Sequence, residues 1–168
     1  MAATDPEREA LTFYLHYQRT SVEAIVAGLD EAAWHTPALP SGWTVAGMMQ
    51  HLGDMEGHWW RGVIEGHHVD LPYDEGRPAY DPAAPFRTDR PAERVLDYYR
   101  EQCAYGDQVL GSTSLSAAPV GRHGDDDAEF VPTVRWVVLH VIEETAAHTG
   151  HLEAARELLD GRTDLGLR

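Results

Sequence analysis

The sequence has no lysine, only one cysteine and no long apolar run. A single cysteine cannot form a disulfide within the chain, and Cys-based zinc motifs are excluded for the same reason. No stretch approaches the roughly 20 apolar residues that a membrane-spanning helix needs. Residues 1–10 also lack the apolar core of a signal peptide. We therefore expect a cytoplasmic protein with no membrane-spanning segment.

Basic residues are scarce as well. The chain has 13 arginines and 28 acidic residues, so the formal net charge is -15 at pH 7. Nucleic-acid-binding domains carry basic patches, and anionic membranes repel an acidic surface. Neither nucleic acid nor a membrane is therefore expected as a partner. The chain does contain ten histidines, and the question is which of them converge in the fold.

Apolar residues recur at helical spacing in four stretches, which predicts helices over residues 6–29, 45–65, 91–110 and 133–159. The connection over residues 67–90 is unusually long and contains four prolines. A connection of this length allows the second and third helices to run parallel to each other. No pair of strands joined by a hairpin turn is evident. The expected fold class is all-α, a four-helix bundle.

The length of 168 residues is typical of one domain, so residues 1–168 are predicted to form a single bundle. Polar residues interrupt the inner face of its last helix. Written as heptads, one core position takes Val134, Val141, His148 and Ala155, and the other takes Val137, Glu144, His151 and Leu158. Burying a carboxylate and two imidazoles costs several kcal/mol unless a partner compensates, and a divalent cation is such a partner.

Glu144 and His148 are separated by one helical turn, so their side chains lie on the same face. This spacing is typical of two ligands of one ion. On the second helix, His51 lies between Met48 and Met55 on the apolar face and is the candidate third ligand. Three protein ligands of the His2Glu type leave positions open for water or substrate, which is the pattern of a catalytic site.

Each candidate also has a purely structural interpretation. Glu144 and His148 are compatible with an exposed ion pair on a solvated face, and His51 with a hydrogen-bonded core histidine. His151 has three open roles, as a fourth ligand, as a partner of a ligand or as a proton shuttle. Arg135 either anchors an anionic substrate or forms a salt bridge within the chain.

Two stretches, SGWTVAGMMQHLGDMEGHWWRGVIEG (41–66) and RWVVLHVIEETAAHTGHLEAARELLDG (135–161), resemble the DinB-like (YfiT-type) superfamily of metal-binding four-helix bundles. Many members carry a histidine on the second helix and HxxxH on the last. His51 and His148 match this pattern, while Glu144 stands where many members have the other histidine. The mycothiol-dependent maleylpyruvate isomerase branch is similar to this His, Glu, His arrangement.

The resemblance implies an up-down-down-up bundle, often dimeric, with zinc or nickel at the triad and a low-molecular-weight thiol as co-substrate. The leading hypothesis is a metal-dependent, mycothiol-type S-transferase or isomerase acting on a small-molecule substrate. A metal-dependent hydrolase and a non-catalytic, stress-related metal-binding protein are the alternatives. An exposed Trp59–Trp60 pair on the second helix is expected to permit a homodimer interface.

Overall fold

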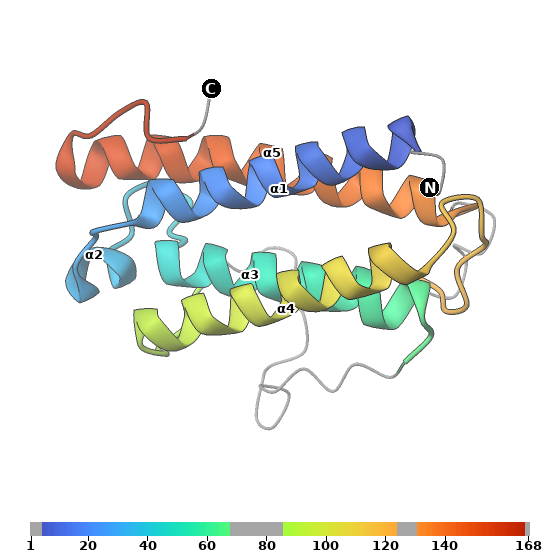
Figure 1. Cartoon of the computed structure of the whole chain (residues 1–168). Helices are drawn as coiled ribbons and strands as arrows, with labels where there is room; N and C mark the ends of the chain where they lie inside the picture. The colour runs from blue at the N-terminus through green and yellow to red at the C-terminus, as the bar shows by residue number, and fades with distance from the viewer. Residues whose placement is uncertain (1–4, 68–85, 124–130, 167–168) are drawn as a thin grey trace.

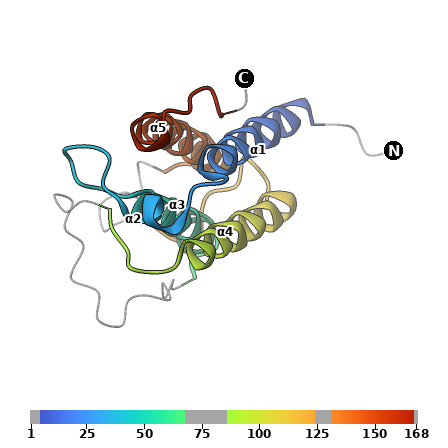
Figure 2. The ribbon, with the colours of Figure 1, turned by 90° about the vertical axis from the view of Figure 1, so that its left-hand side faces the viewer.

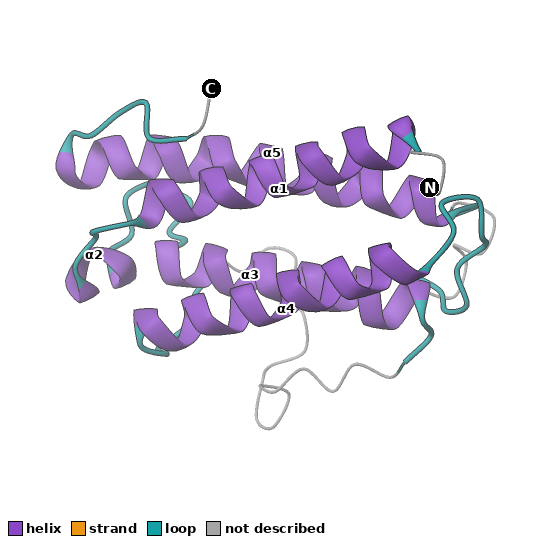
Figure 3. Cartoon of the chain, in the orientation of Figure 1, coloured by secondary structure: helices purple, strands orange, loops and turns teal. Residues whose placement is uncertain are grey.

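The computed structural model describes residues 5–67, 86–123 and 131–166. The helices are α1 (Pro6–Val26), α2 (Glu31–His35), α3 (Val45–Gly57), the π-helical η1 (His58–Ile64), α4 (Ala92–Ser112) and α5 (Val134–Asp160). No strand occurs among the described residues (Figure 3). The all-α prediction is therefore confirmed.

The four long helices form two layers of two, with α1 beside α5 and α3 beside α4 (Figure 1). Helices α3 and α4 run in the same direction, while α1 and α5 run in the opposite one. The order along the chain is thus up, down, down, up, as the resemblance implies. The view along the bundle in Figure 2 shows the same two pairs. The short α2 lies near the N-terminal ends of α3 and α4. Most of the long connection that makes this topology possible lies outside the described residues.

Side-chain caps define where these helices begin. Asp5, Thr44 and Thr133 each accept a hydrogen bond from the backbone N–H three residues ahead, at the first turns of α1, α3 and α5. Such caps satisfy N–H groups that have no partner inside the helix. Gly161, with a φ of 74°, ends α5 in the left-handed conformation that glycine adopts without steric cost.

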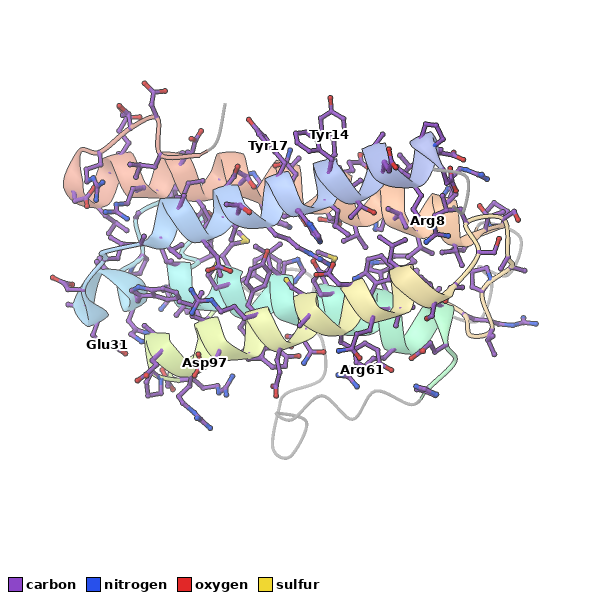
Figure 4. The ribbon with its side chains drawn as sticks, in the orientation of Figure 1. Arg8, Tyr14, Tyr17, Glu31, Arg61 and Asp97 are labelled. Atoms are coloured by element: carbon purple, nitrogen blue, oxygen red, sulfur yellow. The ribbon has the colours of Figure 1, made fainter. Side chains whose placement is uncertain are left out.

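The first helix ends at Val26, three residues before the predicted limit of residue 29. Ala27 is already extended and Gly28 takes a left-handed φ of 74°, and α2 begins at Glu31. Asp30 caps α2 by accepting a hydrogen bond from Ala33 N–H at 2.8 Å. A helix of five residues is too short to show a periodic pattern, so α2 was not predicted. Glu31, labelled in Figure 4, also accepts a hydrogen bond from the Ala92 N–H at 3.1 Å, so α2 fixes the start of α4.

The core consists of aliphatic and aromatic side chains from all four long helices. On α1, Leu15 is fully buried, whereas Tyr14 is exposed and points away from the bundle (Figure 4). The expectation of an exposed Trp59–Trp60 pair is wrong, since both indoles are buried, with 4% and 0% of their surface exposed. Turning from α3 into the π-helical η1 brings them into the core, so they form no dimer interface.

An ion pair is buried among these apolar groups. Arg19 of α1 donates two hydrogen bonds to the Glu56 carboxylate of α3, at 2.7 and 2.6 Å. Trp60 Nε1 and the Cys103 thiol also donate to this carboxylate. Burial alone lowers the pKa of Arg19, but the Glu56 carboxylate outweighs it, so the net direction is upward. Because its carboxylate is neutralised and hydrogen-bonded, Glu56 tolerates full burial.

None of the helices formed by the described residues combines the length and apolar character that a membrane span requires.

Candidate metal centre

Helix α3 contributes His51. The apolar side chains of this helix, Met48, Leu52 and Met55 among them, pack into the core. His51 lies beside this apolar face and is half-buried. Its ring is therefore held at the border between core and solvent, facing α5.

Helix α5 contributes Glu144 and His148, one turn apart. The Nε2 atom of His148 lies 3.2 Å from a carboxylate oxygen of Glu144, and the two side chains are 12% and 36% exposed. The spacing of the two residues thus places them together, as predicted.

The heptad assignment of α5 holds at one position, but at the other it holds for Val137, which is fully buried, and fails further along the helix. Val134, Val141 and Ala155 are buried, but Leu158 is 61% exposed and His151 is also exposed. A straight α-helix has 3.6 residues per turn, whereas a heptad pattern assumes 3.5. The buried face therefore shifts gradually around the axis of a long helix. The buried residues after Val141 include Thr145, Leu152 and Arg156. The polar residues therefore lie along the edge of the seam and do not interrupt the core.

His51, Glu144 and His148 nevertheless converge. One ligand atom from each lies within 4.8 Å of those of the other two, and they are the only such group among the described residues. The His51 and His148 rings meet edge to face, with centroids 5.0 Å apart. Bonds of about 2.0–2.2 Å to a tetrahedral ion place ligand atoms about 3.3–3.6 Å apart. Small side-chain rotations bring the three atoms to that separation, so the residues fit a divalent ion.

The protonation of His148 favours ligation. Burial lowers the pKa of His148, the Glu144 carboxylate raises it, and His151 lowers it again, with a net downward shift. The imidazole is therefore neutral at pH 7, which is the form that binds metals. Nitrogen and carboxylate oxygen donors in this ratio suit zinc, and imidazole also suits nickel.

Phe86 covers one side of the triad. Its ring stacks on His51 with centroids 4.0 Å apart, and it meets His148 edge to face at 6.1 Å. The Phe86 carbonyl accepts a hydrogen bond from Thr44 N–H at 3.1 Å. A Cβ added at Gly47 would lie 2.0 Å from this carbonyl oxygen. The missing side chain of Gly47 therefore lets residues 86–87 lie directly on α3.

His151 lies next to the triad without joining it. Its Nδ1 is 3.3 Å from Nδ1 of His148, the ring nitrogen that faces away from Glu144. The His151 ring also lies 6.5 Å from the buried Trp43 ring. Groups that contact the second nitrogen of a ligating histidine orient its ring and tune its basicity. Of the three roles left open for His151, this arrangement matches that of a partner of a ligand.

Arg135 forms the salt bridge that was the alternative to substrate anchoring. It donates two hydrogen bonds to the Glu7 carboxylate, one of them at 2.9 Å, near the start of α5. Glu144 lies nine residues further along the same helix, about 13 Å away at 1.5 Å per residue. Arg135 therefore joins α1 to α5 and does not reach the triad.

Sequence reasoning missed two groups near the site. Phe86 and Trp43 are aromatic residues in irregular segments, where no periodic pattern marks them. The buried position of Glu56 was also missed, because a glutamate within a helix is ordinarily exposed. Burial, with Glu56 adding to it, raises the pKa of the Cys103 thiol well above its ordinary value. It carries no thiolate at neutral pH.

Comparison with known proteins agrees with this architecture. None of the curated proteins matches the chain. The structure is similar to the crystal structure of a conserved protein from Enterococcus faecalis, with a TM-score of 0.64 and 17% identity over 96% of this chain and 99% of that one. That likeness shows the fold alone. The sequence profile of the mycothiol S-transferase family, by contrast, matches residues 10–161. The chain therefore belongs to the mycothiol S-transferase family.

Proposed function

We propose that this protein is a metal-dependent S-transferase or isomerase that uses a mycothiol-type thiol and a small-molecule electrophile. His51, Glu144 and His148 are the proposed ligands of zinc or nickel. The observation that carries the proposal is the convergence of these three donors within 4.8 Å in a member of a thiol-transferase family.

When bound, such an ion supplies Lewis-acid chemistry that lowers the pKa of a coordinated thiol. The residues of the chain perform the other tasks. Phe86 and Trp43 present apolar surface beside the site and limit the access of water. His151 is exposed and contacts His148, so it is placed to pass a proton between the site and solvent.

The test is metal content and thiol consumption in protein purified without a His-tag. We expect about one divalent ion per chain, and metal-dependent consumption of mycothiol in the presence of chlorinated or epoxide electrophiles. His148→Ala should lose both. His16→Ala is the matched control, because His16 is an exposed histidine that pairs with Asp107, far along the chain from the triad. Wild-type protein that binds no zinc or nickel would overturn the proposal.

The same assay separates the alternatives. Product formation without any thiol would favour the hydrolase, with His151 as base. A metal that raises the melting temperature while every electrophile stays unchanged would favour the non-catalytic metal-binding protein. The homodimer expected from the resemblance remains a prediction, which light scattering measures directly.

A further inference from the structure

A second group of histidines lies away from the triad and surrounds the buried Trp59 ring. His58 belongs to η1, His123 to the segment after α4, and His140 to α5. The Nε2 atom of His58 lies 2.7 Å from Nδ1 of His123. The Trp59 ring stacks on His123 at 4.8 Å between centroids and meets His140 edge to face at 4.6 Å. The triad uses none of these imidazoles.

Backbone contacts fix the position of His123. Val120 and Gly121 donate N–H hydrogen bonds to the carbonyls of Ile64 and Val63, at 3.0 and 2.9 Å. A Cβ added at Gly121 would lie 2.0 Å from the Gly62 carbonyl oxygen, so only glycine allows this approach. The chain is therefore attached to the last turn of η1 two residues before His123. This attachment brings His123 next to His58 from a distant part of the sequence.

The surroundings keep His58 neutral. Burial lowers the pKa of His58 to about 4, and the nearby His123 and His140 contribute in the same direction. At pH 7 this imidazole is therefore neutral, with a lone pair on one ring nitrogen and a proton on the other. The proton that His58 and His123 share in their hydrogen bond must leave the space between the two nitrogens when a metal binds. The overall charge of -15 also favours the approach of cations.

We propose that His58 and His123 form a second metal site, which takes Cu2+ or Ni2+ with water at the remaining positions. Two nitrogens about 2.05 Å from one ion lie about 2.9 Å apart at a right angle and about 3.3 Å apart at the tetrahedral angle. The observed 2.7 Å is nearer to the right angle. Square-planar and tetragonal nitrogen sites are those of Cu2+ and Ni2+, so zinc should bind here more weakly. His140 is not one of the two proposed ligands. It contacts the ring of Trp59, which in turn stacks on His123.

The experiment uses His148→Ala protein, which lacks one of the proposed triad ligands. Metal binding measured in this variant therefore reports on the second site and does not depend on whether the triad binds an ion. Calorimetry with Cu2+ and with Ni2+ should give about one ion per chain. Adding His123→Ala should weaken binding more than about tenfold, the loss that removal of even an outer partner typically causes. His123 is exposed, so this substitution leaves the core intact. His16→Ala in the same background should change nothing.

Trp59 provides a second readout. Bound Cu2+ should quench its fluorescence, because the His123 ring stacks on the indole. Trp59→Phe should remove most of the quenching. Gly121→Ala should weaken binding while both ligands are retained, since it displaces the segment that carries His123. Equal Cu2+ and Ni2+ binding with and without His123, or binding of zinc as tight as that of Cu2+, would overturn the proposal and leave a hydrogen-bonded histidine pair.

Discussion

Gly47→Ala should separate the role of Phe86 from that of the ligands. Gly47 lies one helical turn before His51, and its missing side chain lets residues 86–87 contact α3. A methyl group there would lie 2.0 Å from the Phe86 carbonyl oxygen and 2.5 Å from the Arg87 nitrogen, where ordinary contacts are 3.4–4 Å. Both neighbours are backbone atoms, so they cannot turn aside. The segment must move by more than about 1 Å.

Two opposing effects set the size of the change. Displacing Phe86 breaks the hydrogen bond from the buried Thr44 N–H, and an unpaired buried donor costs about 1–3 kcal/mol. Alanine in place of glycine within a helix raises the free energy of unfolding by up to about 1 kcal/mol. We expect a net loss of about 1–2 kcal/mol in the free energy of unfolding. The His51 ring also loses its stacking partner, so zinc affinity should fall about tenfold.

Gly150→Ala is the matched control. Gly150 is a helical glycine two residues after His148, and a Cβ there meets nothing within 4 Å. It should gain up to about 1 kcal/mol of stability and keep the wild-type zinc affinity. Urea denaturation of the metal-free proteins and calorimetric zinc titration measure the two effects. If both variants behave alike, Phe86 neither orients His51 nor depends on Gly47.

Three further predictions follow from the buried and titratable groups. Glu56→Gln should lower the free energy of unfolding by about 3 kcal/mol, because it removes the buried carboxylate that pairs with Arg19 and leaves only the partly exposed Asp107, 2.7 Å away, as its anionic partner. The double variant Arg19→Met with Glu56→Leu should recover most of this in urea denaturation. In metal-free protein, stability should fall as pH drops from about 6.5 to 4, since unfolded His58 takes up a proton that the folded form, with a pKa of about 4, does not. His58→Gln should flatten that part of the pH profile, and an unchanged slope would show that other groups cause it. Chelation should leave the far-UV circular dichroism unchanged and lower only the melting temperature, whereas loss of helicity would indicate a structural metal.

Helix positions were predictable because local signals and tertiary packing agree. Asp5 and Thr44, both of residue types that favour the N-cap, cap α1 and α3 in the structure, and Gly161 ends α5. The error on α1 has a local cause, since Gly28 takes a left-handed φ of 74° before Leu29, the last residue of the periodic pattern. The π-helical turn of η1 has no such signal. Trp59 and Trp60 are consecutive residues that are both buried, which a helix with a single buried face does not predict.

The convergence of His51, Glu144 and His148 was predictable because it depends on spacing along one helix and on one facing histidine. The surroundings of these residues were not. Phe86 reaches His51 through a glycine contact that only the folded chain brings about. His123 reaches His58 through backbone hydrogen bonds between distant segments. Neither relation follows a period, so neither is visible before the chain is folded.

The edge position of the triad has a consequence for the role of a metal. Val141, Thr145 and Leu152 continue the buried seam of α5 past the site, while Glu144 remains 36% exposed. The core therefore closes without the ion, in contrast to structural zinc sites, where ligation replaces a core. Under the proposed function, this exposed edge is the side from which a thiol and an electrophile would approach. Because the buried face shifts around α5, the side chains that stabilise the fold are different from those of the triad. Loss of an ion should therefore affect the chemistry of the site more than the stability of the fold.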